Sequence, residues 1–304
     1  MAGTEHGWDQ QSFTGTESCT IDYDRDHRAL ARRLCERLDH GDGFAVVTGV
    51  PVRSMTTTQA QELAAALCRP LGGLLRQGRG SDTAITWLVR DEGVSAYTDG
   101  RRFTEGAYTS KSRGDLHLHN DTAVTPFGAE PDYIALLAHR AARRGGDSLL
   151  ADAVTVHRVL ARDYPRELAL LHTPFAFDRR HVTPPGRQPV VWGPPFDAAA
   201  GRIRVRCNVR RMRSAYDLLG EPLPPERSAA IDALDEVLTC PGIAISIPLA
   251  EGDCLLVDDR RILHGRTTYE DHEDPSRRRC LVRVMVQKHP AEKTSTRITA
   301  GFSG

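Results

Sequence analysis

The sequence GDLHLHNDTA, residues 114–123, places two histidines and two aspartates within one short stretch. If this stretch is a β-strand, its side chains alternate between two faces, and the leucines lie opposite the charged groups. A strand face that carries both imidazoles and carboxylates is more typical of a metal site than of a solvated edge. We therefore predict a strand over 115–121. The side chains on its polar face would be Asp115, His117, His119 and Asp121.

The pattern His-x-Asp narrows the choice of metal ligands. Residues two apart on a strand are about 6.6 Å apart at Cα, so the side chains of His119 and Asp121 can reach one ion. By the same rise His117 is about 13 Å from Asp121, and it is expected beside the metal, facing the substrate, or in a structural role. The pattern also begins at His40, in a turn, and at His272, in an acidic loop. We interpret both of those pairs as solvated loop residues.

A third ligand has to come from another part of the chain. The stretch EGDCLLVDDRRILHGRTTY, residues 251–269, offers His264 at the end of a short predicted strand, 262–264. Gly265 follows it and allows a close approach of another backbone. Two histidines and one carboxylate form the facial triad of non-haem Fe(II) oxygenases, which leaves coordination positions open for reagents. Zinc in a hydrolase uses the same residue types, and a lone histidine is often a core or surface residue, so spacing alone leaves these alternatives open.

Hydrophobic periodicity predicts the remaining elements. Most predicted strands follow residue 115 and the helices lie outside them, which favours a mainly β fold with flanking helices, an antiparallel double-sheet roll. The predicted helices are 27–39, 57–69, a helix capped by Asp152 that runs to about 162, and 224–239. The predicted strands besides 115–121 and 262–264 are a buried strand within 41–52, 81–90, 133–138, 189–193, 202–207, 243–248, 253–257 and 280–287.

Composition limits the classes of partner. The chain has 304 residues, 40 basic and 40 acidic, so no overall charge attracts nucleic acid or anionic lipid. No apolar run approaches the length of a membrane-spanning helix, and the first residues lack the features of a signal peptide. The seven cysteines contain no C-x-x-C pair, which favours reduced thiols. We expect a cytoplasmic protein that acts on a small molecule, without a nucleic-acid or membrane partner; a homo-oligomer is compatible with the sequence.

Four stretches taken together resemble a known enzyme family. HNDTA, PDYIALLAHRAARRGGDSLLADA, DDRRILHGRTTY and RRRCLVRVMV occur in the order found in Fe(II)/2-oxoglutarate-dependent dioxygenases of the taurine dioxygenase, γ-butyrobetaine hydroxylase and clavaminate synthase branch. The resemblance covers about 115–288 and extends loosely to GFAVVTGVPV, residues 43–52. It implies a double-stranded β-helix, or jelly roll, in one domain over 1–304. The jelly-roll core would be 115–288, and 1–114 would supply helices and a lid.

The resemblance also implies roles for single residues. His119, Asp121 and His264 match the iron ligands. Arg279 matches the arginine that pairs with the distal carboxylate of 2-oxoglutarate, to which a guanidinium can donate two parallel hydrogen bonds. Ser148 matches a hydroxyl that bonds the same carboxylate, although an ordinary turn serine is an equal alternative. Because residues 277–279 are all arginine, Arg278 is a second candidate for the cosubstrate arginine. We prefer Arg279, which together with the arginine four residues later reproduces R-x-x-x-R.

For the substrate, the resemblance implies that Arg283, on the same strand face as Arg279, receives a carboxylate; a structural or cosubstrate role is the alternative. O2 and 2-oxoglutarate would be consumed, with succinate and CO2 as products. Related halogenases have a small apolar residue in place of Asp121, so this sequence favours hydroxylation, with desaturation or ring formation as alternatives. We expect an amino acid or its derivative as substrate in bacterial specialised metabolism, such as antibiotic biosynthesis. A nucleoside, a nucleotide or another natural-product intermediate stays open, as does a non-catalytic binding protein.

Two polar segments could also contribute to a site. The stretch RIRVRCNVRRMR, residues 202–213, is interpreted as a solvated basic face, with contact to an anionic substrate as the alternative. The segment 91–114, with Tyr97, Tyr108 and Arg113, is a candidate lid over the site.

Overall fold

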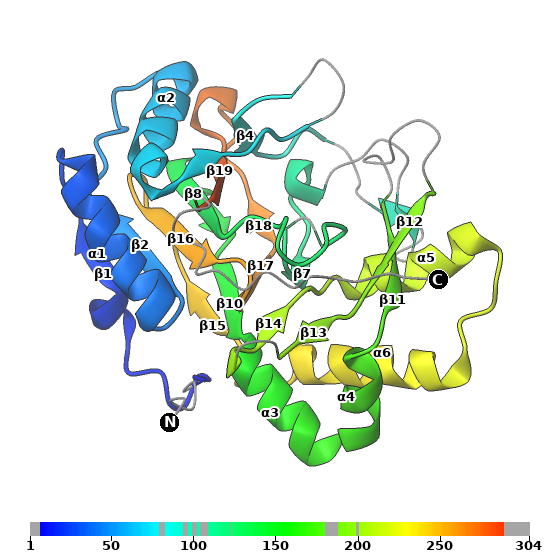
Figure 1. Ribbon diagram of the computed structural model, residues 1–304. Coiled ribbons are helices and arrows are strands. Elements are labelled where there is room, and N and C mark those ends of the chain that lie inside the picture. The colour runs from blue at the N-terminus through cyan, green and yellow to red at the C-terminus, as the bar shows by residue number, and fades with distance from the viewer. Residues whose placement is uncertain are drawn as a thin grey trace, which may run out of the picture.

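Two β-sheets form the centre of the protein (Figure 1). The computed structural model describes residues 7–78, 83–93, 97–98, 102–103, 109–121, 123–179, 188–198 and 201–288. The large sheet has the order β1 (Thr20–Asp22), β2 (Phe44–Thr48), β16 (Cys254–Asp258), β8 (Tyr133–Arg140), β19 (Cys280–Gln287) and β3 (Gly73–Leu74), with β4 (Thr86–Val89) also paired to β19. The small sheet has the order β15 (Ile245–Ile247), β10 (Ser148–Asp152), β17 (Ile262–Arg266) and β7 (Leu116–His119).

The described residues also form four two-stranded ribbons and a few short 3₁₀ helices. The ribbons are β11 (Phe175–Asp178) with β12 (Val190–Gly193), β13 (Phe196–Asp197) with β14 (Arg204–Val205), β9 (Arg144–Gly145) with β18 (Tyr269–Glu270), and β5 (Tyr97–Thr98) with β6 (Arg102–Phe103). The 3₁₀ helices are Thr16–Cys19, Arg69–Leu71, Thr109–Lys111 and Pro275–Arg277.

The two sheets face each other across a shared apolar core because alternate residues of each strand point inward. Ile134 and Met285 of the large sheet pack in one cluster with Leu150 and Ile262 of the small sheet. The other face of the large sheet packs against helices α1 (His27–His40) and α2 (Thr57–Cys68). The large-sheet strands are therefore buried on both sides, which explains their nearly continuous apolar sequence.

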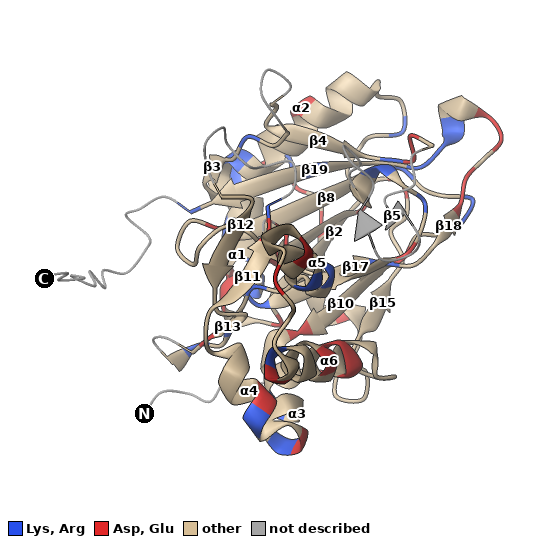
Figure 2. Ribbon diagram, turned by 90° about the vertical axis from the view of Figure 1, so that its right-hand side faces the viewer, with Lys and Arg blue, Asp and Glu red and all other residues tan. Residues whose placement is uncertain are grey.

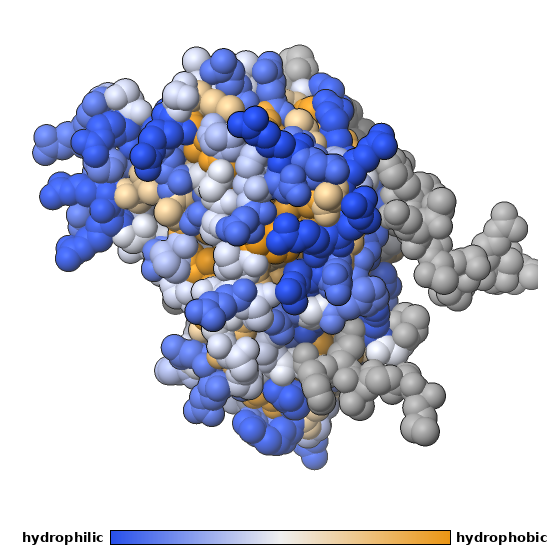
Figure 3. All heavy atoms as spheres, turned by 90° about the vertical axis from the view of Figure 1, so that its left-hand side faces the viewer, coloured by the Kyte–Doolittle hydropathy of each residue, from blue (hydrophilic) through white to orange (hydrophobic). Residues whose placement is uncertain are grey.

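Helices also cover the outer face of the small sheet. Leu118, Ala151 and Leu263 of that sheet pack with residues of α3 (Ala153–Asp163), α4 (Pro165–Leu171), α5 (Val209–Leu219) and α6 (Pro225–Thr239). On the opposite side of the molecule, the face covered by α1 and α2 is mostly hydrophilic, with small apolar patches (Figure 3). Among the described residues, no helix has the length and apolar character needed to cross a membrane.

The predicted architecture is confirmed: two mainly antiparallel sheets form a roll with helices outside, and within the described residues only β1 and β2 pair in parallel. The helix predicted to follow Asp152 is α3, and the Asp152 side chain accepts a hydrogen bond from the Val154 amide at its start. The predictions for α1, α2 and α6 agree with the structure to within about one residue at each end.

Some details of the predicted elements were wrong. The strand predicted over 115–121 ends at His119, so Asp121 lies beyond it. Helices α4 and α5 were not predicted, although Asn208 caps α5 through the Arg211 amide and Gly220 ends it in the left-handed region, φ 66°. These capping residues were available in the sequence as signals for a helix.

The basic stretch 202–213 is not a solvated strand face. Strand β14 contains only Arg204–Val205, and the residues from Val209 onward are helical. Arg206 is buried, with its guanidinium 4.6 Å from the Phe177 ring centroid and with Nη1 donating to the Thr125 carbonyl. Arg206 therefore has a structural role in packing against an aromatic ring and is not part of a solvated basic surface.

Part of the predicted lid, including Tyr108, falls outside the described residues. Tyr97 belongs to β5, which pairs with β6. Arg113 is mostly exposed, with Nε 3.9 Å from Asp91 Oδ2. The lid stays a prediction.

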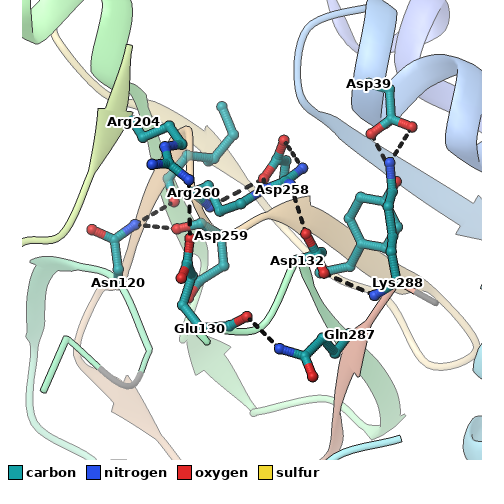
Figure 4. A network of polar contacts seen from close by, with 12 residues as sticks. Asp39, Asn120, Glu130, Asp132, Arg204, Asp258, Asp259, Arg260, Gln287 and Lys288 are labelled. Atoms are coloured by element: carbon teal, nitrogen blue, oxygen red, sulfur yellow. Dashed lines mark hydrogen bonds and ion pairs between the residues drawn. The ribbon is translucent and has the colours of Figure 1, made fainter. Parts of the chain in front are cut away.

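A network of buried ionic contacts joins the strand ends near β8 and β16 (Figure 4). Arg260 Nη1 donates to Asp132 Oδ1 at 2.5 Å, and its Nε donates to Asp258 Oδ1 at 2.9 Å. Both carboxylates are buried, with side chains 4% and 7% exposed. Asp132 Oδ2 also accepts from the Lys288 amide at 2.8 Å. Arg260 therefore neutralises two carboxylates that water cannot solvate.

We expect Arg260→Met to lower the free energy of unfolding by about 3–5 kcal/mol, because it leaves buried carboxylates without a cation. Urea denaturation with an unchanged m-value would measure this loss. Arg162→Met is the control, since the Arg162–Asp163 pair is exposed and its loss should change stability by less than about 0.5 kcal/mol. Equal stability changes in the two variants would contradict a structural role for the network.

Candidate metal centre

The pairing of β7 with β17 brings His119 and His264 together. The two histidines are direct partners across the antiparallel pair, with ring centroids 4.5 Å apart. The register shifts between His264 and Arg266, where Gly265 crosses Leu116 closely. A Cβ added to Gly265 would lie 2.6 Å from the Leu116 carbonyl oxygen, so glycine is required for this approach. The close approach expected at Gly265 is confirmed.

Asp121 reaches the same point from a turn that Asn120 holds in place. The buried Asn120 side chain donates through Nδ2 to the Asp259 carbonyl at 2.6 Å (Figure 4). Its Oδ1 accepts from the Cys207 amide at 2.9 Å. The Asp121 amide donates to Asp259 Oδ1 at 3.2 Å. The position of Asp121 therefore depends on a buried amide anchor rather than on strand alternation.

The three predicted ligands converge on one point. One ligand atom from each of His119, Asp121 and His264 lies within 4.8 Å of the other two. His119 Nε2 is 3.8 Å from Asp121 Oδ1, and His264 Nε2 is 4.0 Å from Asp121 Oδ2. Adjacent donors of one ion at about 2.1 Å lie roughly 3–3.4 Å apart, so the three side chains surround a common point and would move closer together on binding an ion.

The surroundings keep the imidazoles ready to bind a cation. His119 Nδ1 lies 2.8 Å from the His117 carbonyl, a contact that fits donation from Nδ1 and leaves the Nε2 lone pair toward the centre. His264 Nδ1 faces Asp259 Oδ1 at 3.4 Å. Burial, aided by the neighbouring His264, lowers the pKa of His119 to about 3. Burial also lowers the pKa of His264, so both rings are neutral at pH 7 and can act as ligands.

Arg283 faces the third ligand directly. Its Nη1 donates to both Asp121 oxygens, at 3.0 and 2.9 Å, and its Nε donates to Gln77 Oε1 at 2.8 Å. Burial opposes ionisation of Asp121, but the charge of Arg283 and the two histidines hold its pKa below the usual value. Asp121 is therefore an anionic ligand whose orientation depends on Arg283. No sequence signal pointed to Gln77.

A second group of buried cations lines the same cavity as the three predicted ligands. Arg279 and Arg266 are each 4% exposed and stack on the Tyr269 ring, 4.9 and 5.0 Å from its centroid. Arg279 Nη1 and Arg266 Nη1 have no hydrogen-bond partner among the described residues. Burial and the neighbouring Arg279 lower the pKa of Arg266 to about 10. Buried guanidinium groups with unused donors fit an anionic ligand.

Arg266 is not among the site residues predicted from the sequence, although its spacing from His264 was a usable signal. It follows His264 by two residues, so both side chains lie on one face of β17. Arg278, the alternative to Arg279, is exposed, and its Nε makes only a 3.4 Å contact with the His272 carbonyl. Arg279 lines the cavity and Arg278 does not.

The cavity has a volume of about 260 Å³ and is lined by the three predicted ligands together with Ser148, Arg279 and Arg283. Ser148 is buried at the start of β10. His117 does not line this cavity; its side chain is 44% exposed and lies 3.3 Å from Asp115 Oδ2. The structure thus brings every predicted site residue to one cavity except His117. The donor set and the arginines around it fit Fe(II) and a dicarboxylate cosubstrate.

Known proteins support this assignment. A curated relative, the FR-33289 synthase of Streptomyces rubellomurinus (strain ATCC 31215), is 29% identical over 248 residues, which cover 81% of this chain and 69% of the relative. A uridine-5'-phosphate dioxygenase of a Streptomyces species is 28% identical over 262 residues, 82% of this chain and 86% of that protein.

A solved structure shares the fold. The crystal structure of asparagine oxygenase in complex with Fe(II), 2S,3S-3-hydroxyasparagine and succinate matches with a TM-score of 0.65 at 18% identity, over 88% of this chain and 93% of that one. The family described as "Taurine catabolism dioxygenase TauD, TfdA family" matches residues 8–285 of this sequence. The chain therefore belongs to the TauD, TfdA family and is an Fe(II)- and 2-oxoglutarate-dependent dioxygenase.

Proposed function

We propose that the protein hydroxylates an unactivated C–H bond of a small anionic metabolite. The observation that carries this proposal is the shared cavity, which joins the triad of His119, Asp121 and His264 to the buried pair Arg266 and Arg279. Bound Fe(II), with 2-oxoglutarate and O2, would supply the oxidising power, with succinate and CO2 as the other products. The protein's share is to hold these groups and to orient the substrate.

Each residue has a defined task in this proposal. The neutral imidazoles of His119 and His264 and the carboxylate of Asp121 bind the metal. Arg279 and Ser148 bind the far carboxylate of the cosubstrate, and Arg266 adds a second positive charge beside it. Because Asp121 supplies a carboxylate at the third protein position, we expect hydroxylation rather than halogenation.

Two relatives support two different substrate classes. The asparagine oxygenase structure contains a hydroxylated amino acid and shares the fold, which fits the expected amino-acid substrate. The uridine-5'-phosphate dioxygenase is a nearer relative in sequence and acts on a nucleotide, the alternative. Both substrates carry an anionic group. We place the reaction in bacterial specialised metabolism. The predicted contact of Arg283 with a substrate carboxylate stays a prediction, since Arg283 Nη1 contacts Asp121 in the structure.

We expect one Fe(II) per chain to bind through the triad. His119→Ala and His264→Ala should each weaken Fe(II) binding severely, because two remaining donors cannot hold the ion as three do. Anaerobic titration with Fe(II) would measure the affinity. His40→Ala and His272→Ala are matched controls, since neither residue belongs to the cluster. If His272→Ala abolished binding and His264→Ala did not, the assigned third ligand would be incorrect.

We expect Arg279→Gln to raise the Kd for 2-oxoglutarate by about ten- to a hundredfold, the cost of one charge-assisted pair. Calorimetry of the anaerobic Fe(II) protein would measure it. Arg278→Gln should change the Kd little, because Arg278 is exposed and does not line the cavity. A larger effect at position 278 would move the cosubstrate arginine by one residue.

A further inference from the structure

One buried amide holds the arginine that contacts the third metal ligand. Gln77 is 5% exposed, and its Oε1 accepts a hydrogen bond from Arg283 Nε at 2.8 Å. Its Nε2 donates to the carbonyl oxygens of Arg283 and Ile85, at 3.2 and 3.3 Å. An amide nitrogen only donates and an amide oxygen only accepts, so these contacts admit one orientation of the amide. Gln77 therefore holds both the guanidinium of Arg283 and the strand that carries it.

The backbone around Gln77 is also fixed. It lies between β3 and β4, which both pair with β19, and Figure 2 shows β4, β19 and β8 side by side in the large sheet. The Gln77 amide donates to the Ala84 carbonyl at 2.7 Å, and the Ala84 amide donates to the Gln77 carbonyl at 2.9 Å. Two residues earlier, the Leu75 amide donates to the Met285 carbonyl at 2.9 Å. The side chain of Gln77 thus starts from a backbone that is tied to two neighbouring segments.

The position of Arg283 on β19 directs its side chain toward the metal centre. Val282 packs on the face of the large sheet that helices α1 and α2 cover, whereas Met285 packs between the two sheets. Because strand side chains alternate, Arg283 shares the inner face with Met285. A cation on this largely apolar face is costly to bury unless its donors are paired. Gln77 and Asp121 supply acceptors for its Nε and its Nη1.

The two partners of Arg283 differ in charge, and this difference assigns their roles. Asp121 is a carboxylate, and Arg283 Nη1 donates to both of its oxygens. Gln77 is neutral, so it orients the guanidinium without taking charge away from the contact with Asp121. If the Gln77 oxygen were removed, the buried Nε donor would lose this acceptor, and the guanidinium would be free to turn toward another one.

We propose that Gln77 is a positioning residue for the metal centre: it fixes Arg283, which in turn fixes the carboxylate of Asp121 for metal binding. This inference rests on the Fe(II) binding of the proposed function and names a residue that sets its geometry. Arg283 contacts both oxygens of Asp121 through one nitrogen, so one oxygen can bind the metal while the other keeps its contact with Arg283. Replacing a residue that orients a metal ligand typically costs about ten- to a hundredfold in metal affinity.

The test is anaerobic titration of the metal-free protein with Fe(II). We expect Gln77→Met, which keeps the length of the side chain and removes its hydrogen bonds, to raise the Kd for Fe(II) by about tenfold or more. The charge of Arg283 is unchanged in this variant, so the loss reports its position. Gln61→Met on α2 is the matched control, since Gln61 Nε2 donates to Thr86 Oγ1 at 2.9 Å and Gln61 does not line the cavity. An unchanged or lower Kd in Gln77→Met, or an equal rise in the control, would overturn the proposal.

A double-mutant cycle separates positioning from a general loss of stability. In the Arg283→Met background no guanidinium remains to be positioned, so adding Gln77→Met should change the Kd for Fe(II) by less than about twofold. An equal rise in both backgrounds would show that Gln77 does not act through Arg283. If Gln77→Met does not fold, Gln77→Asn replaces it, because the shorter amide stays polar and withdraws its oxygen from Arg283 Nε.

A spectrum adds a readout that a loss of stability alone leaves in place. In the anaerobic complex with Fe(II) and 2-oxoglutarate, the visible charge-transfer band from the metal to the cosubstrate depends on the ligands of the metal. We expect this band to shift in Gln77→Met and to stay at the wild-type wavelength in Gln61→Met. A wild-type band in Gln77→Met would contradict the proposal. Failure of the wild-type protein to bind Fe(II) would instead overturn the proposed function.

Discussion

The metal centre depends on the pairing of β7 with β17. This pairing sets His119 directly opposite His264, and it is possible at this distance because Gly265 has no side chain where it passes Leu116. The same strand then carries Arg266 into the cavity two residues later. A side chain at position 265 would push the strands apart and would separate both histidines and the cosubstrate end of the cavity at once.

Polar groups buried behind the site hold its loops. Asn120 links the turn before Asp121 to the backbone of Asp259 and Cys207. Arg260, which follows Asp259, donates to Asp132 just before the start of β8. These contacts restrict the motion of the loops and fix the geometry of the ligands, as a metal site requires of its supporting residues. Asp121 can thus lie on a turn and still be held in one arrangement.

Charge is distributed unevenly between the scaffold and the cavity. In the scaffold, Arg260 and Arg261 are paired with buried aspartates, so their charges are compensated within the protein. In the cavity, Arg266 and Arg279 retain unused donors among the described residues. Ligands that bring negative charge should therefore stabilise the folded state by linkage, in addition to taking part in the reaction. Binding affinity and stability are coupled at this site.

Local periodicity was enough to predict the helices α1, α2, α3 and α6 and the buried strands, because those patterns depend on neighbours a few residues apart. The family's motifs identified the residues of the triad and Arg279. The tertiary structure decided how they meet. Asp121 lies beyond its strand and is held by Asn120, and Gln77, Arg211 and Arg266 join the cavity from distant parts of the chain. Pairing between segments far apart in the chain depends on the packing of the whole core, which a local pattern does not record.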